Sequence, residues 1–252
     1  MSVRISFVGK GGTGKTTLSA ILINFLIHKN KVPILAVDAD PNFNLNELLG
    51  VKVKTTLSEV RESLLKSEVP DFMSRYEYTE MKVHQILAEN KYFDLLVMGY
   101  PETSGCYCPV YSFLSTALEK LIRAYSYVVI DNEAGMEHIS RLNLTEMEHL
   151  IIVSDASIRG IFTAERIIDL IKNLKIKAEN IWLVVNLCPK NQKNELEKYV
   201  KELITKKKEI KFLGFLPQDA TLLEYELNKI PVFEWKNILK SSAYKLFKKL
   251  FN

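Results

Sequence analysis

The sequence has few cysteines and no long hydrophobic run. Three cysteines in 252 residues are a small and odd number, which argues against a disulfide framework and fits the reducing cytoplasm. No apolar run approaches the roughly 18 residues that are needed to span a bilayer. The first ten residues, MSVRISFVGK, also lack the apolar core and the cleavage site of a signal peptide. We therefore expect a cytoplasmic protein without a membrane partner.

A strong excess of one charge is also missing. The chain contains 34 Lys and Arg against 30 Asp and Glu, a net charge of +4 at pH 7. Its most basic stretch, TKKKEIK at residues 205–211, is more simply explained as the solvated end of a helix and the turn into the next strand. The charge pattern therefore predicts no nucleic-acid partner.

Seven short apolar runs, rich in β-branched residues, alternate with helical patterns. They occupy residues 4–9, 33–38, 94–99, 127–131, 150–155, 181–186 and 210–217. Because both faces of each run are apolar, they are typical of strands buried in a parallel sheet. In the first interval between them, one face of an amphipathic helix is predicted at Leu18, Ile21, Leu22, Phe25 and Leu26. The alternation predicts a doubly wound α/β fold, with a mainly parallel sheet flanked by helices, in a single domain over residues 1–252.

Residues 52–92 fit this alternation least well. The stretches LSEVRESLLKS at 57–67 and MKVHQILAEN at 81–90 have helical patterns, and a proline-containing loop separates them. We expect this region to pack over one edge of the sheet near the ligand site.

A phosphate-binding loop follows the first predicted strand. The sequence GKGGTGKTT at residues 9–17 matches G-x-x-x-x-G-K-[ST] and precedes a predicted helix, which is the context that the motif requires. Its backbone N–H groups and the helix N-terminus favour phosphate oxygens. The predicted nucleotide-binding residues are Gly11, Gly12, Thr13, Gly14, Lys15, Thr16 and Thr17. Lys15 is expected to contact the β- and γ-phosphates, and the Thr16 hydroxyl is expected to hold Mg²⁺.

A second lysine, Lys10, stands in the sequence KGGTGK. This pattern resembles the deviant Walker A signature of the family that contains nitrogenase iron protein, septum-site and plasmid-partition ATPases and metal-insertion ATPases. The resemblance implies a P-loop NTPase in which Lys10 reaches across a homodimer to the partner's phosphates. There it would act on developing negative charge, as an arginine finger does.

Two aspartates end the second predicted strand. The sequence AVDADPNFN at 36–44 resembles switch I of the same family. The resemblance implies that Asp40 orients the attacking water and that Asp38 lies on the magnesium side. The alternative for either residue alone is a helix N-cap.

The Walker B position lies in YSYVVIDNEAGMEH at residues 125–138, where an apolar strand ends in Asp131 and Gly135 follows. Asp131 is therefore the third predicted magnesium residue, beside Thr16 and Asp38. Most of the family reads D-x-P-A-G here, whereas this chain has Asn132 and Glu133. That departure leaves the strand-end carboxylate in place and changes the segment that follows it.

Two further positions are predicted to contact the nucleotide base. Asn186 ends the strand in WLVVNLCP, and Pro217 belongs to LGFLPQD, which resembles the adenine-lining loop of the family. The guanine-reading N-K-x-D motif is missing at Asn186. ATP is therefore expected rather than GTP.

The sequence SGCYCP at 104–109 places Cys106 and Cys108 two positions apart, between a predicted strand and a predicted helix. Residues at i and i+2 of an extended segment point to the same side, and thiolates suit Zn²⁺, Ni²⁺, Cu(I) or iron–sulfur clusters. Two thiolates are half of a four-sulfur site, which a symmetric dimer would complete. The alternative is a pair of buried or incidental thiols, and Cys188 is expected to be a small core residue.

The whole pattern resembles the CooC family of nickel-insertion ATPases for carbon monoxide dehydrogenase. The resemblance rests on GKGGTGKTT, DADPNFNLNELLG, CYCPVYSFL and DNEAGMEHISR. It implies a Mg²⁺-dependent ATPase that acts as a nickel metallochaperone. ATP would control dimerisation, and Ni²⁺ or Zn²⁺ would be held between the subunits and delivered to carbon monoxide dehydrogenase or a related nickel enzyme.

Two other functions remain open. An iron–sulfur ATPase that donates electrons, like nitrogenase iron protein, also shares two cysteines per chain across a dimer. A positioning ATPase of the MinD/ParA type would use the C-terminal stretch WKNILKSSAYKLFKKLF at 235–251 as a membrane helix. The apolar stripe of that stretch equally fits a helix docked on the sheet, which we favour.

Overall fold

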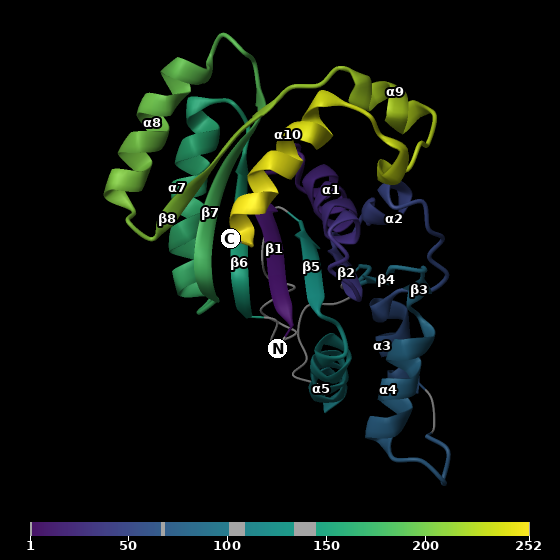
Figure 1. Ribbon diagram of the computed structural model, residues 1–252. Coiled ribbons are helices and arrows are strands. Elements are labelled where there is room, and N and C mark those ends of the chain that lie inside the picture. The colour runs from purple at the N-terminus through teal and green to yellow at the C-terminus, as the bar shows by residue number, and fades with distance from the viewer. Residues whose placement is uncertain (1, 67–68, 101–108, 134–144, 252) are drawn as a thin grey trace.

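The computed structural model describes residues 2–66, 69–100, 109–133 and 145–251 (Figure 1). In these ranges eight strands form one sheet in the order β3-β4-β2-β5-β1-β6-β7-β8. The strands are β1 (Val3–Gly9), β2 (Ile34–Ala39), β3 (Ala88–Glu89), β4 (Phe93–Val97), β5 (Tyr127–Asn132), β6 (Glu146–Ser154), β7 (Lys177–Cys188) and β8 (Ile210–Pro217). The fold is a doubly wound α/β fold with a mainly parallel sheet, as the alternation of patterns predicted.

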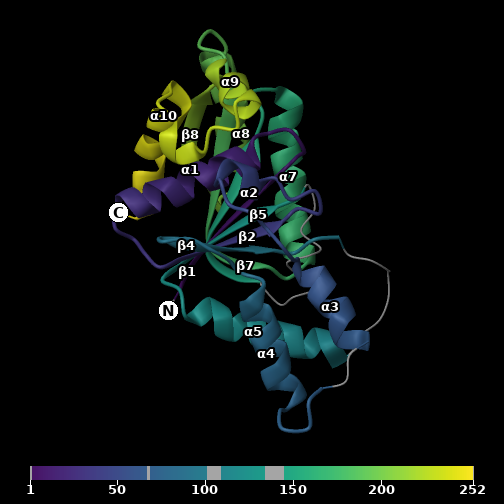
Figure 2. The same cartoon turned by 90° about the vertical axis from the view of Figure 1, so that its right-hand side faces the viewer.

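Helices cover both faces of the sheet. The α-helices are α1 (Lys15–His28), α2 (Leu45–Leu48), α3 (Leu57–Lys66), α4 (Arg75–Gln85), α5 (Pro109–Arg123), α7 (Ile158–Asn173), α8 (Lys193–Lys206), α9 (Thr221–Leu227) and α10 (Ile238–Phe247), with 3₁₀ turns η1 (Val232–Glu234) and η2 (Lys248–Leu250). One hydrophobic cluster joins the sheet to α1 and α10, and a second joins it to α3, α4, α5, α7 and α8. Figure 2 shows α3, α4 and α5 gathered at one end of the molecule, away from α10.

All seven predicted strands are present, and they pair with one another in parallel. Apart from its exposed ends the sheet is buried on both faces, which explains why the runs are apolar throughout. The eighth strand, β3, was not predicted, because residues 81–90 were expected to be helical. That prediction is wrong at its end: α4 stops at Gln85, and β3 pairs antiparallel with β4 through Ala88 and Glu89. The Asn90 N–H donates to the Phe93 carbonyl across the connecting turn at 2.9 Å, so main-chain pairing overrides the helical pattern there.

Helix α1 differs from the predicted amphipathic helix. Every residue from 18 to 26 is buried, including the polar Ser19 and Asn24. The reason is a second layer: α10 lies across the outer side of α1 (Figure 1), and the Phe25 ring packs against Tyr244 at 5.2 Å and Phe247 at 6.1 Å between centroids. A helix covered on both sides has no solvent face to mark with charge.

The C-terminal helix docks on the sheet, as favoured from its sequence. Its apolar stripe is buried at Trp235, Leu239, Ala243, Phe247 and Leu250. Lys240 is buried with it, and its ammonium donates to the carbonyls of Val232, Phe233 and Trp235 at 2.8, 3.3 and 3.1 Å. Ile238, also part of the predicted stripe, is 55% exposed, and the rest of the stripe packs into the protein's own core. In the described ranges, no helix has the length and apolar character to cross a membrane.

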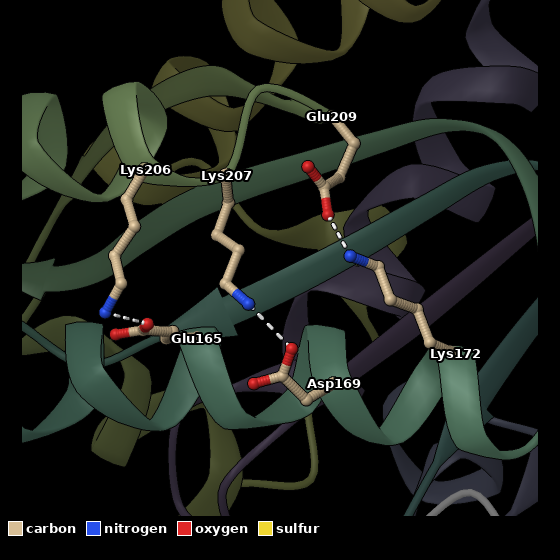
Figure 3. Close-up of polar contacts among 6 residues, drawn as sticks. All are labelled: Glu165, Asp169, Lys172, Lys206, Lys207 and Glu209. Carbon is tan, nitrogen blue, oxygen red and sulfur yellow. Dashed lines mark hydrogen bonds and ion pairs between the residues drawn. The ribbon is translucent and has the colours of Figure 1, made fainter.

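The basic stretch at 205–211 is a helix end and a turn, as predicted: α8 ends at Lys206 and β8 begins at Ile210. Its charges pair with one face of α7 (Figure 3). The three ion pairs are Lys206–Glu165 at 2.5 Å, Lys207–Asp169 at 2.6 Å and Lys172–Glu209 at 2.7 Å. These contacts fasten α7 to the α8–β8 turn.

Candidate functional site

The loop between β1 and α1 makes two close approaches that require glycine. A Cβ atom on Gly9 would lie 2.2 Å from the Val153 carbonyl oxygen of the neighbouring strand β6. Gly14 has a φ of 89°, and a Cβ there would lie 2.5 Å from the Asn186 amide nitrogen. The loop is therefore tightly packed against β6 and Asn186 where it leaves the sheet. The first turn of α1 faces the space above the strand ends.

A cleft of about 460 Å³ opens at this point. Its lining residues are Gly11, Gly12, Gly14, Lys15, Thr16, Thr17, Asp40, Asn42, Asn44 and Glu133. A Cβ added at Gly11 or Gly12 would meet nothing within 4 Å, so the loop backbone borders open space, as a phosphate cradle must. The structure thus brings the predicted phosphate-loop residues together with Asp40. The cleft lies at the carboxyl edge of the sheet, where open α/β folds bind ligands.

Lys15 enters this cleft from a buried position. Its ammonium donates to the Lys10 carbonyl at 3.3 Å, and the Thr13 hydroxyl donates to the same carbonyl at 2.8 Å. Burial lowers the pKa of Lys15, and the carboxylates of Asp131, Asp40 and Glu133 oppose that shift. The Lys10 side chain is exposed. Two lysines of one loop therefore occupy different environments, one inside the site and one outside it.

Asp131 ends β5 as a fully buried carboxylate. Burial raises its pKa to about 6, against the opposing effects of the Thr16 hydroxyl, Lys15 and Ser19. One oxygen, Oδ1, accepts from the Ser19 hydroxyl at 3.2 Å, and Oδ2 has no hydrogen-bond partner within the described part of the chain. An unpartnered buried carboxylate oxygen beside Thr16 fits a magnesium site.

The ligand count fits magnesium as well. Among residues 2–66, 69–100, 109–133 and 145–251 there is no group of three or more His, Cys, Asp and Glu that could hold a metal by itself. Mg²⁺ differs from other protein-bound metals in this respect, since it is commonly held by one or two carboxylates together with substrate phosphates and water. Thr16 and Asp131, whose side chains contact each other, are the residues of this chain that would hold it.

Asp38 lies beside Asp131 across the β2–β5 pair, and it is also fully buried. Burial raises its pKa to about 7, and the charge of Asp131 adds to the shift. Its Oδ1 accepts the Asp40 N–H at 3.1 Å, and its Oδ2 accepts the Leu45 N–H at 2.9 Å. The second contact satisfies the first N–H of α2, whose N-cap residue is Asn44. Asp38 thus holds the segment that carries Asp40, and its magnesium role stays a prediction.

Asp40 is partly exposed and lines the cleft. Its Oδ1 accepts two hydrogen bonds from Asn42, from the backbone N–H at 2.9 Å and from Nδ2 at 3.3 Å. The position beside the phosphate loop suits a carboxylate that orients water.

Asn186 is buried, and its side chain contacts the phosphate loop. Nδ2 donates to the Thr13 carbonyl at 2.9 Å, while Oδ1 is buried without a partner among the described residues. The contact fastens the loop to the end of β7. Pro217 pairs in register with Cys188 at the carboxyl ends of β8 and β7. Base recognition by Asn186 and Pro217 stays a prediction.

Asn132, which follows Asp131, has a local structural role at the end of β5. Nδ2 of Asn132 donates to the Ser6 hydroxyl at 2.7 Å and to the Phe7 carbonyl at 2.8 Å, which ties β5 to β1. Glu133, the next residue, lines the cleft. The family pattern has proline at the position of Glu133, whereas Asn132 stands at its variable position.

Sequence reasoning missed several residues of the cleft. Asn42 and Asn44 line it, and Ser19 donates to Asp131 from the second turn of α1. The alternation of polar residues in DPNFN was a usable signal for the two asparagines. Ser19 carried none, because a serine in a helical pattern usually faces solvent or its own backbone.

Cys106 and Cys108 lie outside the described residues, as does Gly135. The strand that precedes the cysteines ends beside the cleft, where the Met98 N–H donates to the Asp38 carbonyl at 2.9 Å. Cys188 is buried, and burial raises the pKa of its thiol, which keeps the thiol protonated. It is a core residue, as predicted.

Comparisons with known proteins agree with this geometry. The family model of the CobQ/CobB/MinD/ParA nucleotide binding domain matches residues 6–232. An uncharacterized ATP-binding protein of Methanocaldococcus jannaschii is 41% identical over 245 residues, which cover 96% of this chain and 94% of that protein. The carbon monoxide dehydrogenase accessory protein CooC of Rhodospirillum rubrum is 29% identical over 189 residues, which cover 69% of this chain and 71% of that protein. The septum site-determining protein MinD of Pyrococcus horikoshii, solved with Mg-ADP, has the same fold, with a TM-score of 0.68 at 20% identity over 99% of this chain and 96% of its own.

Proposed function

Since the chain is a P-loop ATPase that belongs to the CobQ/CobB/MinD/ParA nucleotide-binding family, we propose that it works as a nickel metallochaperone. In this proposal ATP controls a homodimer that carries Ni²⁺ to carbon monoxide dehydrogenase or a related nickel enzyme. Similarity to the CooC accessory protein supports the metal role, and the cleft supports the ATPase role.

The residues of the cleft divide the hydrolysis of ATP among them. The loop backbone and the buried Lys15 bind the phosphates, and Asp40 orients the attacking water. Thr16 and Asp131 would hold Mg²⁺, which supplies neutralisation of phosphate charge when bound. The exposed side chain of Lys10 is free of the cleft of its own chain, which suits a residue that acts on the partner's nucleotide.

One observation carries the metal half of the proposal. The segment that contains Cys106 and Cys108 follows β4 and Tyr100, and it ends where α5 begins at Pro109; directly after β4, the Met98 N–H donates to the Asp38 carbonyl. Asp38 in turn holds the N–H of Asp40. The cysteine pair is therefore attached, through one strand end, to the segment that carries the water-orienting residue. Such a connection would let nucleotide state and metal state influence each other.

The test is a titration of Ni²⁺ and Zn²⁺ into the reduced protein under anaerobic conditions, without nucleotide, with ADP and with ATP. Metal stoichiometry and oligomeric mass are read together for the wild type and for Cys106→Ser/Cys108→Ser. Cys188→Ser is the matched control, since its thiol is buried in the core. Lys10→Ala separates dimerisation from nucleotide binding.

We expect one ion per dimer in the wild type and in Cys188→Ser, and no tight binding in the double variant. Lys10→Ala should bind ATP but remain monomeric. Metal binding that survives the loss of Cys106 and Cys108 would overturn the metallochaperone proposal. A coloured protein with iron and sulfide would instead indicate the electron-donor alternative.

A further inference from the structure

Three side chains form a hydrogen-bonded chain that leads out of the cleft. The Tyr100 hydroxyl donates to Oδ1 of Asn42 at 3.1 Å. The Asn42 amide then donates through Nδ2 to Oδ1 of Asp40 at 3.3 Å, and its backbone N–H donates to the same oxygen at 2.9 Å. Both donations from Asn42 therefore fall on one oxygen of Asp40. The other oxygen is left to contact what lies in the cleft.

The chain crosses the wall between two cavities. Asp40 and Asn42 line the nucleotide cleft, whereas Phe43 and Tyr100 line a second cavity of about 460 Å³. The turn from Asp40 to Phe43 is closed by the Phe43 N–H, which donates to the Asp40 carbonyl at 2.9 Å. Neighbouring side chains of this turn thus face different cavities.

Hydrogen bonds rather than packing fix these side chains. Asn42 and Tyr100 are exposed, with Tyr100 59% exposed, and Asp40 is partly exposed. An asparagine amide can turn over, which would place its oxygen against the Asp40 carboxylate. A hydroxyl that donates to the amide oxygen prevents this, because it holds the oxygen on the far side and the NH₂ group towards Asp40.

We propose that Asn42 is a positioning residue for Asp40 and that Tyr100 acts through it by fixing the orientation of the amide. The inference deepens the proposed function, since it rests on Asp40 as the residue that orients water. Tyr100 follows β4 and precedes the segment with Cys106 and Cys108. A change in that segment that moves Tyr100 would therefore reach the Asp40 carboxylate through the Asn42 side chain alone.

The experiment is a double-mutant cycle on steady-state ATP hydrolysis with Mg²⁺. The variants are Asn42→Ala, Tyr100→Phe and the double variant, with Tyr92→Phe as the control. Tyr92 is also an exposed tyrosine, 44% exposed, and lies on the turn before β4. Thermal unfolding midpoints are measured for each, and they should match the wild type because the altered side chains are exposed.

We expect kcat to fall about tenfold in Asn42→Ala and about threefold in Tyr100→Phe, on the scale of one weakened positioning contact. KM for ATP should stay within about twofold, since neither residue is assigned to binding. The double variant should be no slower than Asn42→Ala alone, because Tyr100 acts only through Asn42. Tyr92→Phe should keep the wild-type rate.

Asp40→Asn distinguishes a failure of the positioning inference from a failure of the role proposed for Asp40. If Asp40→Asn loses hydrolysis while Tyr100→Phe keeps the wild-type rate, or if the losses in the cycle are additive, the positioning inference is wrong and the role of Asp40 stands. If Asp40→Asn keeps the wild-type kcat, both are wrong, since there is then no water-orienting carboxylate to position.

Discussion

The charges of the nucleotide cleft and the ion pairs between α7 and the α8–β8 turn differ in what surrounds each carboxylate. On α7, Asp169 accepts from Lys207 at the surface, and this bond lowers its pKa. Next to the cleft, Asp38 and Asp131 are fully buried beside each other, and burial raises their pKa values to about 7 and about 6. The charged form of the carboxylate is thus stabilised on α7 and destabilised at Asp38 and Asp131.

The two groups of carboxylates have different roles. Exposed pairs such as those of α7 contribute little to stability, because solvent screens them and long side chains lose freedom. Buried carboxylates next to a buried lysine are costly unless something binds them. Asp38 and Asp131 are such carboxylates, and their presence beside the cleft is typical of a site that binds a charged ligand.

The largest expected effect is found by comparing a lysine substitution in the cleft with a lysine substitution on α7. Lys15→Ala should lower kcat for ATP hydrolysis by about 100-fold or more, because it removes the buried charge that faces the phosphates. Lys172→Ala removes an exposed ammonium paired with Glu209 and should leave the rate unchanged. Steady-state ATPase assays on both variants measure this, and equal rates in the two would contradict the assignment of Lys15.

Lys240 can be compared with Lys15, because its ammonium is also buried but lies outside the cleft. Its ammonium has carbonyl partners at Val232, Phe233 and Trp235, and burial lowers its pKa. Lys240→Met keeps the apolar stem and removes the donor to the Phe233 and Trp235 carbonyls, while Val232 still accepts from Asn24, so we expect a loss of about 2–3 kcal/mol in the free energy of unfolding. Denaturant unfolding checks this. An unchanged midpoint would mean that the carbonyls find other donors.

The pH dependence of stability tests the cost of burying Asp131. Its pKa in the folded chain, about 6, lies above the ordinary value of 3.8, so between these two pH values the folded chain binds more protons than the unfolded chain. The contribution of Asp131 to stability therefore falls as the pH rises from about 4 to about 6, and stays low above that.

Asp131→Asn removes the charge and keeps an oxygen to accept from Ser19. Without nucleotide it should be more stable than the wild type by about 1–3 kcal/mol at pH 8, and the difference should disappear near pH 4. Thermal or denaturant unfolding at several pH values measures it. A difference that does not change with pH would show that burial is not the cause. Mg²⁺-dependent hydrolysis should be lost in the same variant.

The smallest effect is expected at the surface. Glu165→Gln breaks the ion pair with Lys206, and the unfolding midpoint should fall by about 1 °C or less. That small difference should vanish in about 1 M salt, since screening removes what the pair contributes. A loss of several degrees would show that the three pairs of Figure 3 act as a network rather than singly.

Much of the fold could be predicted because its signals are local. Each of the seven runs is apolar on both faces, and the phosphate loop is contiguous, so no long-range information was needed to place them. Strand β3 could not be predicted, since two residues carry no pattern and only the hairpin to β4 defines them.

The residues of the site could be predicted from the sequence, but the hydrogen bonds between them could not. Lys15, Thr16 and Asp40 line one cleft, as the motifs indicate. The contact from Asn186 to Thr13 joins positions 173 apart, and that from Ser19 to Asp131 joins positions 112 apart. No spacing in the sequence encodes such contacts.

The parallel sheet, the phosphate loop and the strand-end carboxylates follow from the sequence alone, because short-range pattern and backbone conformation fix them. Three features depend instead on tertiary contacts: α1 is buried between the sheet and α10, the Asp38 carboxylate accepts from the first N–H of α2, and Tyr100 and Asn42 lead to Asp40. Burial and hydrogen-bond partners depend on which distant segments the sheet order brings together, and that order is a property of the whole fold.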